Sequence, residues 1–170
     1  MDAAEFDAFY AAAARRLVGQ LTAMTGDRAE AQDCVQEAFI KAWRHRSTLA
    51  TTRNPEAWVR TTAWHVAVSR WRRAASALRA HHRHGSAGLT AEPGPEHTDL
   101  MRALRRISAE QRRAIVLHHL CDLSVAEIAR ETGVATGTVK ARLSRGRAAL
   151  ALLLAEQADT DKTREEPRHA

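Results

Sequence analysis

Residues 123–154, LSVAEIARETGVATGTVKARLSRGRAALALLL, constrain the fold of this chain more than any other stretch. Ser124 and Glu127 have the S-x-x-E spacing of a capping box, in which each side chain accepts a hydrogen bond from a backbone N–H at the start of a helix. Gly133 can adopt the left-handed conformation that ends this helix and turns the chain. A second helix follows the turn, because Val139 and the later leucines recur at helical spacing. The pattern predicts a helix-turn-helix.

The second helix of this pair carries lysine and arginine outside its apolar stripe. Such a helix can enter the major groove of DNA, where basic side chains reach base edges and phosphates. The alternative is a helical hairpin within a bundle, whose basic face is simply solvated. Because the capping box, the corner glycine and the basic helix occur together at the spacing of the motif, the sequence favours DNA binding.

The composition of the chain favours a partner that carries many negative charges. The net charge is +6, which suits either nucleic acid or an anionic membrane surface. Insertion into a membrane is not expected, because no apolar run approaches the roughly 18 to 20 residues that span a bilayer. The first ten residues carry acids where a signal peptide carries basic residues. Cys34 and Cys121 lie far apart and form no CxxC motif, which fits reduced thiols in a cytoplasmic protein.

Two amphipathic helices are predicted at the start of the chain, one from Asp2 to Met24 and one from Asp27 to about Arg46. Asp27 is placed to cap the second helix. The apolar and small residues of the second helix share one face: Ala31, Cys34, Val35, Ala38, Phe39 and Ala42. Polar residues lie away from that face: Asp33, Gln36, Glu37 and Lys41. Periodicity alone favours a solvated polar face over a surface that docks a basic protein.

A third helix is predicted from Pro55 to Arg73, after a polar loop over residues 47–54. One stripe of this helix suits a core, whereas a second stripe places Trp64 and Trp71 beside arginines. Aromatic rings in a basic field suit single-stranded nucleic acid, because bases stack on the rings. Tryptophans at helical spacing suit a protein core equally well, and composition does not decide between the two readings.

The region of residues 76–97 loses helical periodicity and accumulates glycine and proline, which predicts a linker. The linker separates a first domain, residues 1–75, from a second domain, residues 98–155. The tail of residues 156–170 is polar and is expected to be disordered. The predicted fold class is therefore all-α, with two small helical domains on either side of a flexible linker.

Four short helices are expected in the second domain, the last two forming the helix-turn-helix. Ser108 and Gln111 form a second capping box at the start of one of them. Leu100, Leu104 and Ile107 share one face of the first of these helices, and Ile115, Val116 and Leu120 of the next are available for a core.

The sequence contains no motif that indicates catalysis. No arrangement of Ser, Cys, His and carboxylates resembles a nucleophilic triad, and no glycine-rich phosphate loop follows a strand. His81, His82 and His84 could ligate a metal, but no second group of ligands is placed to complete a site. An enzymatic activity, a cofactor and a bound metal are therefore not expected.

Three motifs follow one another along the chain: DCVQEAFIKAW at residues 33–43, NPEAWVRTTAWHVAVSRWRR at residues 54–73, and the helix-turn-helix at residues 123–150. Together they resemble the extracytoplasmic-function (ECF) sigma factors of bacterial RNA polymerase. The last motif also occurs in ordinary regulators, so a stand-alone helix-turn-helix regulator is the alternative. The order and spacing of the three in a short chain make the resemblance specific. The ending SRWRR further resembles the actinobacterial branch often called the SigE-like family.

The resemblance implies that the first domain is sigma region 2. Its second helix would bind the β′ clamp helices of core RNA polymerase through Asp33, Gln36, Glu37 and Lys41. Its third helix and the preceding loop would recognise the −10 element and hold it as single-stranded DNA. The residues implied in −10 binding are Asn54, Trp58, Arg60, Trp64, His65, Arg70, Trp71, Arg72 and Arg73.

The second domain would be sigma region 4, which reads the −35 element as duplex DNA and touches the polymerase β flap. The residues implied in −35 binding are Thr136, Thr138, Lys140, Arg142, Ser144 and Arg145. Many relatives have a Ser-Pro pair where this chain has Ala135 and Thr136, so Thr136 is expected to cap the recognition helix. His65 and Ser69 replace common family residues, so the −10 base preference does not transfer. Family members are often held inactive by an anti-sigma factor, which is a further expected partner.

Overall fold

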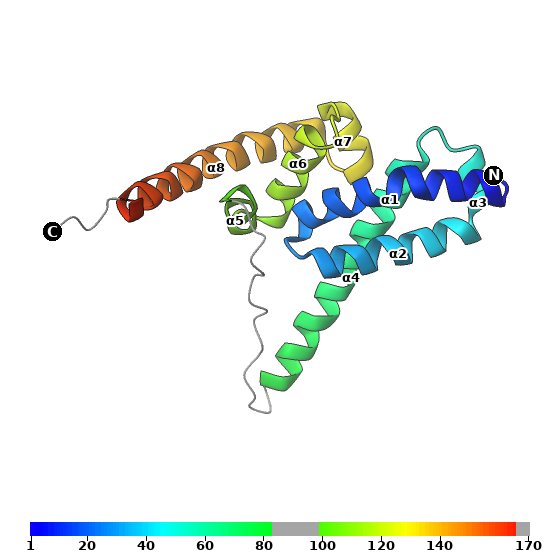
Figure 1. Cartoon of the computed structure of the whole chain (residues 1–170), viewed down its shortest axis with the longest axis horizontal. Helices are drawn as coiled ribbons and strands as arrows, with labels where there is room; N and C mark the ends of the chain where they lie inside the picture. The colour runs from blue at the N-terminus through cyan, green and yellow to red at the C-terminus, as the bar shows by residue number, and fades with distance from the viewer. Residues whose placement is uncertain (83–98, 166–170) are drawn as a thin grey trace. The chain divides into compact units, whose positions relative to one another are not determined.

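The computed structural model describes residues 1–82 and 99–165. Within these residues it contains eight helices and no strand (Figure 1), so the predicted all-α fold is confirmed. The chain divides into two compact units, residues 1–93 and residues 94–170, which we call unit 1 and unit 2. None of the described helices combines the length and the apolar character that crossing a membrane requires.

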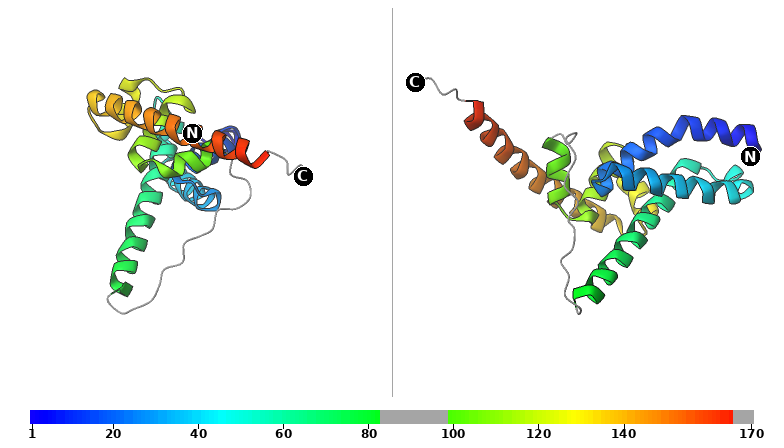
Figure 2. Two further views of the ribbon diagram at one scale, coloured as in Figure 1. Left: turned by 90° about the vertical axis from the view of Figure 1, so that its left-hand side faces the viewer. Right: turned by 60° about the horizontal axis from the view of Figure 1, so that its bottom comes forward.

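The described part of unit 1 consists of α1 (Ala3–Thr25), α2 (Arg28–Arg44), α3 (Arg46–Ala50) and α4 (Pro55–His82). Helix α2 packs along both α1 and α4, and α1 also touches α4. Figures 1 and 2 show α1 and α2 side by side, with the C-terminal part of α4 running away from the pair. Helix α2 therefore lies at the centre of unit 1, between the other two long helices.

Local signals in the sequence set the ends of α1 and α2. The Asp27 carboxylate accepts a hydrogen bond of 2.9 Å from the backbone N–H of Glu30, so the predicted cap is confirmed. Gly26 ends α1 in the left-handed conformation, with φ of 82°. The predicted inward face of α2 is also confirmed, because its six members are all buried: Ala31, Cys34, Val35, Ala38, Phe39 and Ala42.

Two predictions for unit 1 differ from the structure. The loop expected over residues 47–54 begins as a short helix, α3 (Arg46–Ala50), in which Leu49 is buried and attaches the turn to the core. The third helix, expected to end at Arg73, continues as α4 to His82. The added turns contain mainly alanine and other helix-forming residues, and the first glycine follows only at position 85.

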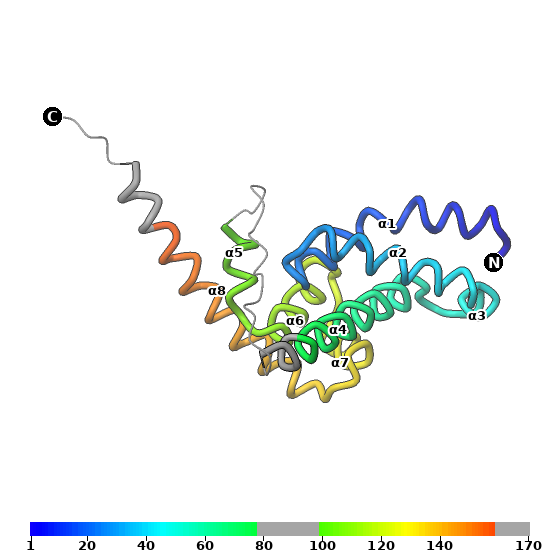
Figure 3. The backbone as a smooth tube through the Cα atoms, turned by 90° about the horizontal axis from the view of Figure 1, so that it is seen from below, coloured from blue at the N-terminus to red at the C-terminus, as the bar shows by residue number. Residues whose placement is uncertain are grey.

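The described part of unit 2 consists of α5 (Asp99–Arg106), α6 (Ala109–His119), α7 (Val125–Thr132) and α8 (Thr136–Glu165). Helix α8 packs against each of the other three, as the tube in Figure 3 shows for α5 and α6. At Gly146 of α8, an added Cβ would lie 2.7 Å from Cδ1 of Ile115 on α6. A glycine at this position therefore permits the close approach of α6 and α8.

The Ser108 cap is confirmed, because its hydroxyl accepts a hydrogen bond of 3.2 Å from the N–H of Gln111. Ile115 and Val116 are buried as expected, whereas the expectation that Leu120 lies in the core is wrong, since it is 50% exposed. Leu120 follows the last turn of α6, where the chain changes direction, and the preceding Leu117 is fully buried instead.

The last helix is longer than the sequence predicted. Helix α8 continues to Glu165, whereas disorder was expected from residue 156. The segment after Ala155 contains no glycine and reaches a proline only at position 167, so nothing in it breaks a helix that has already started. The expectation for residues 166–170 concerns positions outside the described residues.

Candidate nucleic-acid interface

The helix-turn-helix of unit 2 has the cap and the corner that its sequence predicts. The Ser124 hydroxyl accepts from the N–H of Glu127 at 3.3 Å, and the Glu127 carboxylate accepts from the N–H of Ser124 at 2.8 Å. Hydrogen bonds from the Ser124 hydroxyl and N–H hold the pKa of Glu127 below its usual value. Gly133 is left-handed at φ of 70°, and its N–H donates to the carbonyl of Ala129 at 2.9 Å.

The start of α8 differs from the prediction. Thr136 is the first residue of α8 rather than the residue before it, and the N–H of Val139 donates to the carbonyl of Ala135 at 3.1 Å. Ala135 therefore occupies the flanking position, and the prediction that Thr136 caps the helix is wrong.

One face of α8 is buried and the other is open. Val139 and Leu143 are buried and attach the helix to the rest of unit 2. Arg142 is half-buried, and the remaining candidates for −35 binding are exposed: Thr136, Thr138, Lys140, Ser144 and Arg145. Lys140, Arg142 and Arg145 make no hydrogen bond or ion pair with any other described residue. Their charges are thus available to an anionic partner.

Two histidines at the end of α6 connect the parts of the helix-turn-helix, a contact that sequence reasoning missed. His118 Nδ1 lies 2.8 Å from the carbonyl oxygen of Leu123, just before the Ser124 cap. Arg147 Nε on α8 donates to His119 Nε2 at 3.3 Å. Burial, His118 and Arg147 each lower the pKa of His119, which keeps this ring neutral and able to accept the bond.

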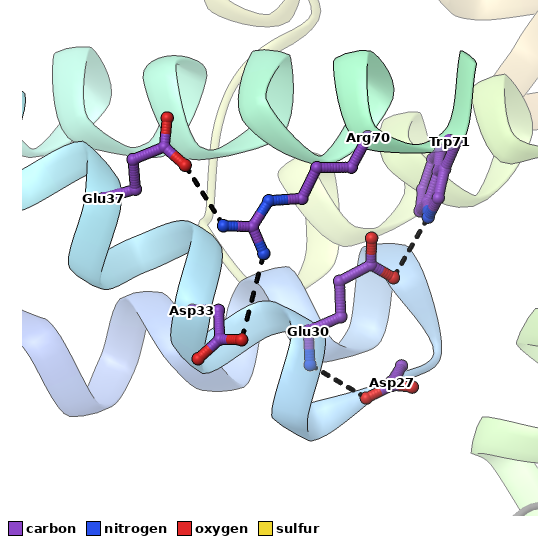
Figure 4. A network of polar contacts seen from close by, with 6 residues as sticks. All are labelled: Asp27, Glu30, Asp33, Glu37, Arg70 and Trp71. Carbon is purple, nitrogen blue, oxygen red and sulfur yellow. Dashed lines mark hydrogen bonds and ion pairs between the residues drawn. The ribbon is translucent and has the colours of Figure 1, made fainter. Parts of the chain in front are cut away.

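The tryptophans of α4 in unit 1 are not equivalent. Trp64 is 7% exposed and belongs to the core, as does Arg60, which is 5% exposed and engaged within the chain. Trp71 is half-buried and meets Trp64 edge to face, with ring centroids 5.6 Å apart and planes at 87°. Its indole Nε1 donates to the Glu30 carboxylate on α2 at 3.0 Å (Figure 4).

Arg70, next to Trp71, pairs with two carboxylates of α2 that were predicted to bind polymerase. Its guanidinium lies 3.1 Å from Glu37 and 3.9 Å from Asp33 (Figure 4). Glu37 also pairs with Lys41 at 2.8 Å. The hydrogen bond from Lys41 lowers the pKa of Glu37, burial opposes it, and Arg70 adds to the lowering. The structure therefore joins the two groups of candidates across the contact between α2 and α4.

The remaining candidates of unit 1 lie at the surface or cap a helix. Asn54 is the cap of α4, because its side-chain oxygen accepts a hydrogen bond of 2.9 Å from the N–H of Ala57. This role was missed, although asparagine before a proline and a helical pattern is its usual signal. Trp58 is half-buried, and four candidates are exposed: Gln36, His65, Arg72 and Arg73.

An aromatic cluster near the start of α1 and the end of α2 was also missed. Phe6 and Trp43 approach edge to face at 5.1 Å, and Tyr10 meets Phe39 in the same way at 4.8 Å. Trp43 is 38% exposed, and the Arg46 guanidinium lies 4.4 Å above its ring. The spacing of the aromatic residues in the two helices was the available signal, but it did not indicate that they meet.

No group of three or more metal-ligating side chains occurs among the side chains that the structure describes. The side chains of His81, His82 and His84 lie outside that part of the chain. Burial raises the pKa of Cys34, so its thiol is protonated and packed in the core.

Comparison with known proteins decides the family. Residues 9–77 match the model of sigma-70 region 2, and residues 97–150 match that of sigma-70 region 4. The ECF RNA polymerase sigma factor SigL of Mycobacterium tuberculosis is 33% identical over 141 residues, which cover 78% of this chain and 79% of SigL. The chain belongs to the ECF sigma factor family. SigM of the same species is 32% identical over 145 residues, covering 81% of this ECF sigma factor and 69% of SigM.

Solved structures agree with this assignment. The sigma factor RpoE of Bartonella quintana, in complex with the anti-sigma factor NepR, gives a TM-score of 0.74 at 26% identity and covers 89% of this chain and 97% of its own. CnrH, in complex with the cytosolic domain of CnrY, shares the fold with a TM-score of 0.63 at 22% identity, covering 91% and 90%. The predicted family is confirmed. The protein is therefore a sigma factor that acts in transcription initiation, and not an enzyme.

Proposed function

We propose that this ECF sigma factor divides promoter recognition between its two units. Unit 2 reads duplex −35 DNA, and unit 1 binds core RNA polymerase and stabilises the opened −10 element. The observation that carries the proposal is that the chain contains two different helices of this kind. Helix α8 of unit 2 has an open basic face, and α4 of unit 1 is rich in aromatic residues and arginine. The first suits duplex DNA and the second suits unstacked bases.

For −35 recognition we propose the open face of α8. Thr136 and Thr138 lie in its first turn, where hydroxyls suit phosphate contacts; Arg142 follows about one turn after Thr138, and Arg145 about one turn after Arg142. Ser144 and Lys140 complete the face. Arginine can contact a guanine edge with two hydrogen bonds, so Arg142 and Arg145 are the proposed base readers.

For −10 recognition we propose the accessible part of α4 and its cap. The proposed contacts are Asn54, Trp58, His65, Trp71, Arg72 and Arg73. Arg60 and Trp64 are buried in the free chain, so we assign them to the support of this surface rather than to contact with DNA. Arg70 is half-buried against α2 and reaches DNA only by leaving its carboxylates.

For core polymerase we propose the polar face of α2, with Asp33 and Gln36 as its most accessible members and Glu37 and Lys41 beside them. The proposed contacts on the polymerase are the β′ clamp helices for unit 1 and the β flap for unit 2. An anti-sigma factor as a partner is supported by RpoE, whose solved structure is a complex with one. Joining core polymerase implies a cytoplasmic protein. Membership of the SigE-like branch stays a prediction from the SRWRR motif.

The test is reconstitution with core polymerase. The purified chain is mixed with core enzyme, the complex is isolated by gel filtration, and transcription starts are mapped after induced expression. We expect a stable complex and starts downstream of a common pair of promoter elements. Absence of a core complex, together with dimerisation and tight binding of duplex DNA by the chain alone, would instead support a stand-alone regulator.

A further inference from the structure

We propose that Glu30 is a positioning residue, which holds the Trp71 ring as a stacking platform for an unpaired base. Glu30 belongs neither to the core-binding face nor to the proposed DNA contacts. The inference rests on the proposed role of α4 in holding opened −10 DNA.

Two contacts fix the Trp71 ring in one orientation. On one side its indole Nε1 donates to Glu30 Oε2 at 3.0 Å (Figure 4). The ring also meets Trp64 edge to face at 5.6 Å, and Trp64 cannot move aside because it is 7% exposed and packed in the core. The hydrogen bond uses the edge of the indole, and an edge-to-face contact occupies at most one ring face. Because Trp71 is only half-buried, part of the ring stays accessible.

Glu30 is itself held in place by the fold. It lies in the first turn of α2, and its own N–H donates to the Asp27 cap at 2.9 Å. Helix α2 packs along both α1 and α4, so its first turn is attached to rigid neighbours. A side chain that orients another one is effective when it stands on such a rigid element.

The charge of Glu30 argues for a specific purpose. A carboxylate beside a DNA-binding helix repels phosphates, and the exposed arginines Arg72 and Arg73 follow Trp71 directly. The negative charge therefore does not serve DNA affinity, and the contribution of Glu30 lies in its acceptor oxygen. The carboxylate accepts the indole N–H, and it orders a large side chain before DNA arrives. Ordering a side chain in advance removes an entropic cost of binding.

The experiment uses holoenzyme assembled from core polymerase and the full chain, on a promoter identified by start-site mapping. Two templates are compared: a fully duplex promoter and the same promoter with a mismatched, already open −10 region. The variants are Glu30→Ala, Glu30→Gln, Trp71→Phe and Trp71→Ala. Gln32→Ala is the matched control, because Gln32 is exposed on the same turn of α2.

We expect Glu30→Ala to slow open-complex formation on the duplex template by about two- to tenfold, the size that corresponds to ordering one side chain. The open template should abolish the defect. Glu30→Gln should restore opening, because its side-chain oxygen also accepts the indole N–H. Trp71→Phe, which keeps a ring but loses the donor, should resemble Glu30→Ala. Combining Trp71→Phe with Glu30→Ala should add no further loss.

Two results would overturn the proposal while leaving the proposed function intact. One is normal opening by Glu30→Ala when Trp71→Ala is impaired. The other is normal opening by Trp71→Phe. Normal opening by Trp71→Ala would instead remove Trp71 from the proposed −10 surface. If Glu30→Ala lowers the melting temperature strongly, the opening rates of Glu30→Gln and Trp71→Phe are compared instead. Glu30→Gln keeps the acceptor and Trp71→Phe keeps a ring, so the proposal requires normal opening by the first and slow opening by the second.

Discussion

The two units present their candidate DNA-binding side chains in opposite ways. In unit 2, Lys140, Arg142 and Arg145 have no hydrogen-bonding or ion-pair partner among the described residues. In unit 1, Trp64 is part of the core, and Arg70 and Trp71 are held by carboxylates of α2. The difference teaches that a helix with one buried stripe leaves its charges ready for a rigid duplex. In α4, contacts within unit 1 instead hold Trp71 in one orientation while part of its ring stays accessible, an arrangement that suits the stacking of unpaired bases.

The largest expected effect is on the stability of unit 1, and it tests whether Trp64 is a core residue. Trp64→Ala should lower the free energy of unfolding of unit 1 by about 3 to 5 kcal/mol, because it leaves a large cavity beside Trp71. Chemical denaturation of the full chain, followed by circular dichroism, measures this loss. Trp58→Ala, at a half-buried position of the same helix, is the control and should cost clearly less. Equal losses would remove the distinction between the tryptophans.

The next effect is on the stability of unit 2 and concerns the close contact between α6 and α8 at Gly146. Gly146→Leu should destabilise unit 2 by about 3 kcal/mol, because even a Cβ at this position meets Ile115 at 2.7 Å. Gly137→Ala is the matched control on the same helix, since nothing lies within 4 Å of its added Cβ. It should be neutral or slightly stabilising. Thermal melting of both variants checks the pair, and an unchanged melting temperature for Gly146→Leu would contradict the tight packing.

A smaller effect tests the openness of α8. Arg142→Ala should weaken holoenzyme binding to a duplex −35 element by about 1 to 3 kcal/mol and relax the preference at one base position. Its folding should be unaffected, because Arg142 has no partner among the described residues. Binding to promoter variants is measured by fluorescence anisotropy at fixed salt. Equal affinity of wild type and variant for all sequences would remove Arg142 from the proposed readers.

The smallest expected effect is on the stability of unit 2, through the Ser124 cap at the start of α7. Ser124→Ala should cost about 1 kcal/mol of unit 2 stability through loss of the cap. The pKa of Glu127 is lowered in the folded chain, so its contribution is present above its ordinary pKa and is lost as the pH falls through the lowered value. Denaturation at neutral and acid pH should show this loss in the wild type. Glu127→Gln should remove that part of the pH dependence, and an identical pH profile would contradict the assignment.

Local features of the fold were predictable because their causes lie within a few residues. The caps at Asp27 and Ser124 and the turn at Gly133 follow from short-range hydrogen bonding and backbone conformation. The bond between Trp71 and Glu30 joins residues 41 positions apart, and helical spacing within α4 does not report it. Periodicity likewise could not separate Trp64 from Trp71, because α4 is covered from two directions and both stripes are partly buried. The end of α8 was missed because polarity was taken as a sign of disorder, although the segment contains no helix breaker.

The ion pairs of Glu37 affect the rate at which the proposed polymerase-binding face of α2 would meet a partner. Lys41 and Arg70 neutralise this carboxylate within the protein, so it adds little to the electric field that a distant partner senses. Asp33, which is 68% exposed and 3.9 Å from Arg70, keeps more of its field. Added salt should therefore slow the diffusional encounter less than a count of the acids on α2 suggests. On the proposed polymerase-binding face of α2, Asp33 is the carboxylate that is least neutralised, so we expect contact geometry to contribute more than long-range attraction to the orientation of the complex.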